Sequence, residues 1–110
     1  MKVFNHHVYE YKKGLRRLIL LTTSSVNEKN IAQRLNRAGI EFLIYNVNAG
    51  KINVFFGSKV CVDVIKAINK PSLNEYTSEE DFILGTLLGY CREQQYERYL
   101  KMKAKTAKSN

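Results

Sequence analysis

The stretch EFLIYNVNAGKINVFF, residues 41–56, decides the fold of this chain. Two runs of apolar and β-branched residues, EFLIYNV at 41–47 and KINVFF at 51–56, flank the sequence Asn48-Ala49-Gly50. A Gly in such a turn can supply a positive φ, and this composition around a short loop is typical of two antiparallel strands. We therefore predict a β-hairpin and place the other elements around it.

One helix-capping signal precedes the hairpin in the sequence. We expect a strand before this signal and a helix after it. The apolar run LRRLILLTT, residues 15–23, has the length and flanks of a buried strand. Ser25-Val26-Asn27-Glu28 has the pattern of a capping box, so a helix is predicted from there to Gly39. A short helix near 6–13, which Gly14 ends, is expected at the start of the chain.

A third helix follows the hairpin, because Gly57-Ser58 opens a stripe of apolar residues that Lys70-Pro71 closes. The predicted fold class is therefore α+β. Its three-stranded sheet is of the split βαβ (βαββα) type, with a short N-terminal helix and a long C-terminal helix. In this topology the first strand lies at an edge, beside the second strand of the hairpin. We expect one domain over residues 1–102 and a Lys-rich flexible tail over 103–110.

The C-terminal helix is the longest expected element. Thr77-Ser78-Glu79-Glu80 forms a second capping box, and we predict one unbroken helix over residues 78–102. At 1.5 Å per residue such a helix spans about 37 Å, and its first half is apolar almost all round. A helix of this kind needs covering on several sides, which favours a homodimer. The residues expected at the interface are Phe82, Gly85, Leu88 and Gly89.

The composition describes a soluble chain with a basic charge. The 110 residues are 45% hydrophobic and carry a net charge of +8, so a sizeable core is expected and wholesale disorder is not. The start, MKVFNHHVYE, lacks the apolar stretch of a signal peptide, and no apolar run reaches the roughly 18 residues of a membrane span. We therefore expect a cytoplasmic protein, with Cys61 and Cys91 reduced and buried in apolar segments.

The basic residues gather at the two ends of the chain. Residues 1–20 contain five basic residues against one acidic residue, and residues 98–110 contain five basic residues and no acidic one. A basic balance favours an acidic protein or nucleic acid as the partner. The expected basic patch comprises Lys12, Lys13, Arg16, Arg17, Arg98 and Lys101.

No group of residues reaches the pattern of a catalytic, cofactor or metal site. His6-His7 is the one candidate, but adjacent helical residues point about 100° apart, so a metal would need ligands from elsewhere. We therefore expect a binding or accessory protein without catalysis. Nucleic-acid binding through the basic ends, and a small enzyme that uses His6 or His7, are the alternatives.

Three segments together resemble a known family: HHVYEYKKGLRRL at 6–18, KINVFFG at 51–57 and EEDFILGTLLGYCREQQYERYL at 79–100. The family is a group of small bacterial proteins known as a domain of unknown function, number twenty twenty-three. The resemblance implies about three strands, several helices and a homodimer, and it brings no catalytic residues. It also implies an encoded neighbour of the flavodoxin type. Flavodoxins are strongly acidic, so a basic companion suits them electrostatically.

Overall fold

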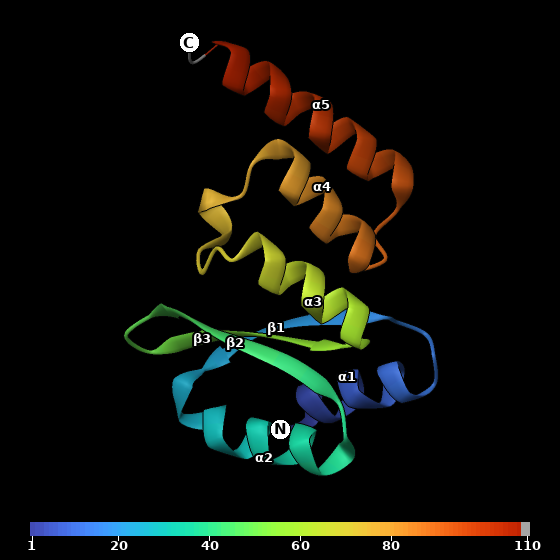
Figure 1. Cartoon of the computed structure of the whole chain (residues 1–110), viewed down its shortest axis with the longest axis vertical. Coiled ribbons are helices and arrows are strands. Elements are labelled where there is room, and N and C mark those ends of the chain that lie inside the picture. Colours follow the sequence, from blue (N-terminus) through green and yellow to red (C-terminus); the bar gives the residue numbers. More distant parts are fainter. Residues whose placement is uncertain (109–110) are drawn as a thin grey trace.

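A three-stranded antiparallel sheet lies at the centre of the molecule (Figure 1). The computed structural model describes residues 1–108. The strands are β1 (Leu18–Ser24), β2 (Glu41–Asn48) and β3 (Lys51–Gly57), in the order β1-β3-β2. This order, with β3 antiparallel to both neighbours, confirms the split βαβ arrangement and the edge position of β1.

The turn of the hairpin is held by a side chain. The Gly50 backbone N–H donates a hydrogen bond of 3.0 Å to Asn48 Oδ1. Gly50 does not take the positive φ that its sequence allows, because the bulge between Asn46 and Asn48 absorbs the change of direction. The hairpin was predicted correctly, and its turn differs in detail.

The sheet separates two apolar clusters. Side chains alternate along each strand, so Ile52, Val54 and Phe56 of β3 face one side of the sheet, while Phe55 faces the other. Residues 52–57 of this central strand are buried throughout. The molecule therefore has two cores, one on each face of one sheet.

Helices α1 (Lys2–Lys12) and α2 (Glu28–Ala38) cover the first face. Helix α1 starts four residues earlier than expected. The capping box predicted at Ser25–Glu28 is wrong, because residues Ser25–Asn27 form a short 3₁₀ helix ahead of α2. Ser25 therefore lies inside that turn, and Ser24 caps it by accepting a hydrogen bond from the Val26 N–H.

The other helices are stacked on the second face (Figure 1). Helix α3 (Lys59–Ile68) lies on the sheet, α4 (Ser78–Leu87) lies on α3, and α5 (Arg92–Lys108) lies on α4. A short 3₁₀ helix, Leu73–Glu75, leads into α4. The capping box at Thr77 and Glu80 is confirmed, with both reciprocal hydrogen bonds present. The stacking gives the described chain a long dimension of 46 Å.

The unbroken helix predicted over residues 78–102 is wrong. The chain reverses between Leu87 and Arg92, and α5 folds back along α4. Gly89 adopts a φ of +80°. The Gly89 N–H donates to the Thr86 carbonyl and the Tyr90 N–H donates to the Gly85 carbonyl, the pair of bonds that ends a helix in a Schellman motif. The long C-terminal helix exists as α5, which continues to Lys108.

The Lys-rich end of the chain begins inside α5. Residues 103–108 are helical, and Lys103 forms an ion pair with Glu79 of α4. Residues 109–110 of the expected tail lie outside the described residues. The mobility of this segment stays a prediction. Within residues 1–108, no helix is long and apolar enough to cross a membrane.

Candidate functional site

The charges of the molecule are divided between its two ends. Residues 1–40 contain eight basic residues and two acidic ones, and they supply the edge strand β1 and the helices α1 and α2 that cover one face of the sheet. The acidic start of α4 lies on the other side, where its three carboxylates meet basic side chains. The pairs are Lys103–Glu79 at 2.7 Å, Lys70–Glu80 at 2.6 Å and Arg98–Asp81 at 2.7 Å. The excess positive charge therefore lies mainly on the α1–α2 side.

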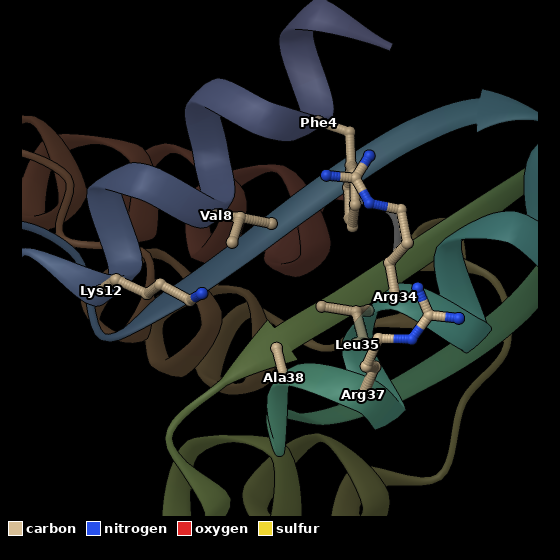
Figure 2. A pocket seen from close by; sticks show the side chains of 7 residues that line it. All are labelled: Phe4, Val8, Lys12, Arg34, Leu35, Arg37 and Ala38. Atoms are coloured by element: carbon tan, nitrogen blue, oxygen red, sulfur yellow. The ribbon is translucent and has the colours of Figure 1, made fainter.

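A groove runs between α1 and α2 (Figure 2). It has a volume of about 330 Å³. Four apolar side chains line it: Phe4, Val8, Leu35 and Ala38. Three basic side chains complete its lining: Lys12, Arg34 and Arg37. We call this site the α1–α2 groove.

Helical spacing places these side chains on facing stripes. Phe4, Val8 and Lys12 follow each other at intervals of four residues, so they share one side of α1. Arg34 and Ala38 have the same spacing on α2. Figure 2 shows the Lys12 ammonium reaching from α1 toward α2.

Phe4 anchors one wall of the α1–α2 groove. Its ring is only 1% exposed and meets the Phe56 ring of β3 edge-on, with 5.7 Å between the centroids. The Arg34 guanidinium carbon lies 4.9 Å from the centroid of the Phe4 ring, a cation–π distance. The buried core therefore positions a charged side chain at the surface.

The cations of the α1–α2 groove lack acidic partners. Among the described residues, no carboxylate lies within ion-pair distance of Lys12, Arg34 or Arg37. Glu10 is the only acidic residue of α1, and its carboxylate faces His7 and Arg16 instead, at 3.3 and 3.8 Å. Unpaired cations over an apolar floor can bind a ligand that combines negative charge with apolar surface.

The expected basic patch does not form one surface. Lys12 lines the α1–α2 groove. Lys13 lies over the Tyr9 ring, and Arg17 Nε donates to Ser58 Oγ at 3.3 Å. Arg16, Arg98 and Lys101 complete the set: Arg16 lies near Glu10, Arg98 is bound to Asp81, and Lys101 is exposed on α5. Helices α1 and α5 lie on opposite sides of the sheet (Figure 1).

Arg34 and Arg37 were missed by the sequence reasoning. They lie inside the chain at positions 34 and 37, whereas the expected basic patch was drawn from the charge at its two ends. Their spacing of three residues, on either side of Leu35, was a usable signal for a shared helix face. That signal becomes informative only when the topology brings α1 beside α2.

The expected interface residues are partly covered by the chain itself. Gly85 lies directly under the Gln95 side chain of α5, and Leu88 is 5% exposed within the single chain. Phe82 is half-buried against the rings of Tyr96 and Tyr99, with centroid distances of 5.9 and 5.7 Å. Gly89 is exposed in the turn between α4 and α5. The interface stays a prediction.

The outer side of the α4–α5 hairpin presents an apolar hollow of about 470 Å³. Its apolar lining consists of Phe82, Ile83, Tyr96, Tyr99 and Leu100. Ile83, Tyr96 and Leu100 are among the exposed large apolar side chains, and Leu100 is 64% exposed. We call this surface the hairpin face.

Hydrogen bonds across the hairpin shift the pKa values of its acidic and basic groups. The Lys103 ammonium and the Tyr99 hydroxyl, which donates a bond of 2.9 Å, lower the pKa of Glu79. The Lys70 ammonium lowers the pKa of Glu80. Two hydrogen bonds to Asp81, at 2.7 and 2.9 Å, raise the pKa of the Arg98 guanidinium. The bonds of Glu79 and Asp81 hold α5 against α4, and the Lys70–Glu80 pair fixes the segment before α4 to the start of that helix.

The two histidines share one carboxylate. His7 Nδ1 lies 3.3 Å from Glu10 Oε1, and His6 Nε2 lies 3.6 Å from the same atom. Within residues 1–108, no cluster of three or more His, Cys, Asp or Glu side chains is arranged to hold a metal ion. Cys61 is buried as expected. The expected burial of Cys91 is wrong, because the reversal of the chain before α5 exposes it.

Comparison with known proteins places the chain in a family without indicating an activity. No curated protein matches it. Residues 2–102 match the family described as protein of unknown function (DUF2023). The match covers every strand and all helices except the last turns of α5. The chain therefore belongs to the DUF2023 family of proteins of unknown function.

Proposed function

We propose that this chain is a non-catalytic, homodimeric binding protein that docks an acidic protein partner. A flavodoxin-type electron carrier is the specific candidate. The α1–α2 side of the sheet is the surface that meets the partner, and the hairpin face is the surface that meets the second copy. The two surfaces lie on opposite sides of the sheet, so both can be occupied at once.

The observation that carries the proposal is the uneven pairing of the charges. The basic side chains that face α4 are engaged with Glu79, Glu80 and Asp81. In contrast, Lys12, Arg34 and Arg37 have no acidic partner among the described residues. An unpaired basic surface attracts an acidic protein by long-range steering and by contact pairs, both of which weaken as salt increases.

The homodimer is supported by the hairpin face and by the charges beside it. Glu93 and Glu97 lie in the first half of α5 and Lys101 lies in the second, and the structure pairs none of them. Two antiparallel copies of α5 would place acidic residues of one copy near basic residues of the other. The exposed Tyr96 and Leu100 side chains would then be covered.

The docking proposal is tested by mixing the protein with a purified flavodoxin at low and at high salt. Binding at low salt that disappears at high salt is the expected result, measured by isothermal titration calorimetry. Absence of binding at low salt contradicts the flavodoxin proposal. Duplex DNA is titrated in parallel, because preferential binding of DNA, with a steep dependence on salt, would support nucleic acid as the partner.

The homodimer is tested by light scattering. About twice the 12.7 kDa chain mass is expected at micromolar concentration. Leu100→Glu places a charge in the hairpin face and should yield a monomer, while Leu15→Glu alters a similarly exposed leucine elsewhere and should not. A wild-type monomer contradicts the homodimer.

A further inference from the structure

We propose that the α1–α2 groove recognises an acidic protein segment by taking one apolar side chain between Lys12 and Arg34, while carboxylates on either side of that residue bind the surrounding cations. The inference rests on the proposed function and specifies which segment of an acidic partner is bound, and where. It replaces a diffuse attraction between oppositely charged proteins by one anchored contact.

The floor of the groove argues for an apolar side chain in the ligand. Val8 and Ala38 expose apolar atoms to a space that no other part of the described chain fills, and the fully buried Leu35 completes the lining. Val8 is only half-buried, although it packs against the core cluster beneath α1. Covering this surface releases water from apolar atoms, at about 25 cal/mol for each Å² that is buried.

The small size and the open shape of the groove together favour a single side chain of a protein as the ligand. The groove volume of about 330 Å³ lies at the lower end of the range for small-molecule pockets, about 300–1,000 Å³. The groove also lies open between two helices on the surface (Figure 2). Such a site accommodates one anchoring side chain while the rest of the ligand stays outside it.

The rim of the groove argues for carboxylates on both sides of the anchor. Lys12 comes from α1, whereas Arg34 and Arg37 come from α2. A segment with acidic residues before and after its apolar anchor would therefore meet a cation on each wall. The planar guanidinium group of an Arg binds a carboxylate with two parallel hydrogen bonds. Contact with Phe4 orients the Arg34 side chain before any ligand arrives.

The charge of the groove is tested with a short fluorescent peptide in which a single Phe is flanked on each side by glutamates. Its affinity is measured by fluorescence anisotropy at low salt. The variant K12A/R34A/R37A should bind at least about tenfold more weakly than the control K51A/K66A/R92A, which removes the same charge from exposed basic residues elsewhere. Equal losses in the two variants would overturn the inference, because overall charge would then explain the binding.

The shape of the groove is tested without any change of charge. Ala38→Phe fills the groove from the exposed end of α2, and Ala67→Phe makes the same change at an exposed position of α3. Wild type and Ala67→Phe should prefer the Phe peptide to one with Ser at that position by about tenfold. Ala38→Phe should lose this preference while still binding both peptides. A preference that survives Ala38→Phe contradicts the apolar anchor.

Two further measurements separate this inference from the proposed function. Flavodoxin that binds wild type and K12A/R34A/R37A equally well overturns the inference and the assignment of the docking surface, while flavodoxin as the partner still stands. Peptide binding that depends on the groove, without any binding of flavodoxin, supports the inference and overturns the specific partner. Inorganic phosphate is also added as a competitor of the two peptides. If it displaces the Phe peptide and the Ser peptide equally well, the groove is a small-anion site and the inference is overturned.

Discussion

The sheet with its two cores and the α4–α5 hairpin are stabilised in different ways. Eleven of the core side chains on the strands and on helices α1–α3 are fully buried, including Phe4, Ile31, Phe56 and Val62. In α5, Gln95 is the one described side chain that is buried. Ion pairs and the rings around Phe82 hold α5 in place. The sheet region depends on the burial of apolar surface, to which α4 adds Leu84 and its C-cap Leu88. The attachment of α5 to α4 depends largely on exposed charges and on the rings around Phe82.

One small domain can therefore contain two regions of different stability. Local opening requires less free energy where few apolar contacts are broken. Exposed ion pairs contribute little and weaken as salt increases. We therefore expect α5 to separate from α4 under conditions in which the sheet remains folded.

The largest effect is expected at the centre of the sheet. Phe56→Ala removes a fully buried ring that contacts Phe4 and should lower the free energy of unfolding by about 3–5 kcal/mol. Phe82→Ala removes a half-buried ring from the hairpin and should cost clearly less. Urea denaturation followed by circular dichroism measures both values. Equal losses would mean that the hairpin belongs to the same cooperative unit as the sheet.

Gly89→Ala should weaken the hairpin by about 1 kcal/mol, because Gly89 has a φ of +80° that alanine adopts only with strain. Hydrogen exchange should then accelerate in α5 and stay unchanged in β3. Gly50→Ala is the matched control, since Gly50 has open space around it and no positive φ. Faster exchange in β3 of the Gly89→Ala protein would contradict the separation of the two regions.

Tyr76→Phe should leave the stability unchanged or raise it by up to about 1 kcal/mol. The Tyr76 hydroxyl is buried and has no hydrogen-bond partner, and burial raises the pKa of Tyr76 to about 12. Removing the hydroxyl therefore removes a desolvation cost and no bond. Thermal unfolding measures the change, with the exposed Tyr9→Phe as the control. A clear loss of stability would reveal a partner for this hydroxyl.

The smallest effect on the stability of the hairpin is expected when the pH is lowered. Hydrogen bonds from Lys103 and Tyr99 of α5 lower the pKa of Glu79 below the ordinary value of 4.5. The folded hairpin therefore binds fewer protons than the unfolded chain in this range, so the contribution is complete above pH 4.5 and is lost as the pH falls through the lowered value. Hydrogen exchange in α5 should accelerate below pH 4 and stay constant, after correction for the intrinsic rate, between pH 5 and 7. Acceleration already at pH 6 would contradict this.

Local signals in the sequence predicted the sheet and most helices correctly. The two apolar runs around the turn in residues 41–56, and the length and flanks of the apolar run 15–23, were sufficient to predict the strands. Gly39 was interpreted as the end of a helix, and it is one. Gly89 carries the same signal, but it was interpreted together with Gly85 as a surface for a second helix. A second helix does pack against α4, but it is α5 of the same chain.

The α1–α2 groove could not be predicted in the same way. Lys12 and Arg34 are 22 positions apart, and only the placement of α1 and α2 on the same face of the sheet brings them to one groove. Charge counted along the sequence selected the two chain ends instead. Arg98 illustrates the error, because its charge is engaged with Asp81 across the hairpin. Charge pairing depends on the tertiary structure.

The rings around Phe82 give the protein a built-in optical reporter. The chain contains seven tyrosines and no tryptophan. Tyr96 stacks on Phe82 and Tyr99 meets it edge-on, so both lie in an asymmetric environment only while α5 rests on α4. The Tyr96 and Tyr99 part of the near-ultraviolet circular dichroism should therefore follow the docking of α5, while Tyr45 and Tyr76 in the second core keep their part as long as the sheet is folded. Far-ultraviolet signals follow the helices whether or not they are docked. The two spectra of one unlabelled sample can thus separate undocking of α5 from unfolding of the sheet.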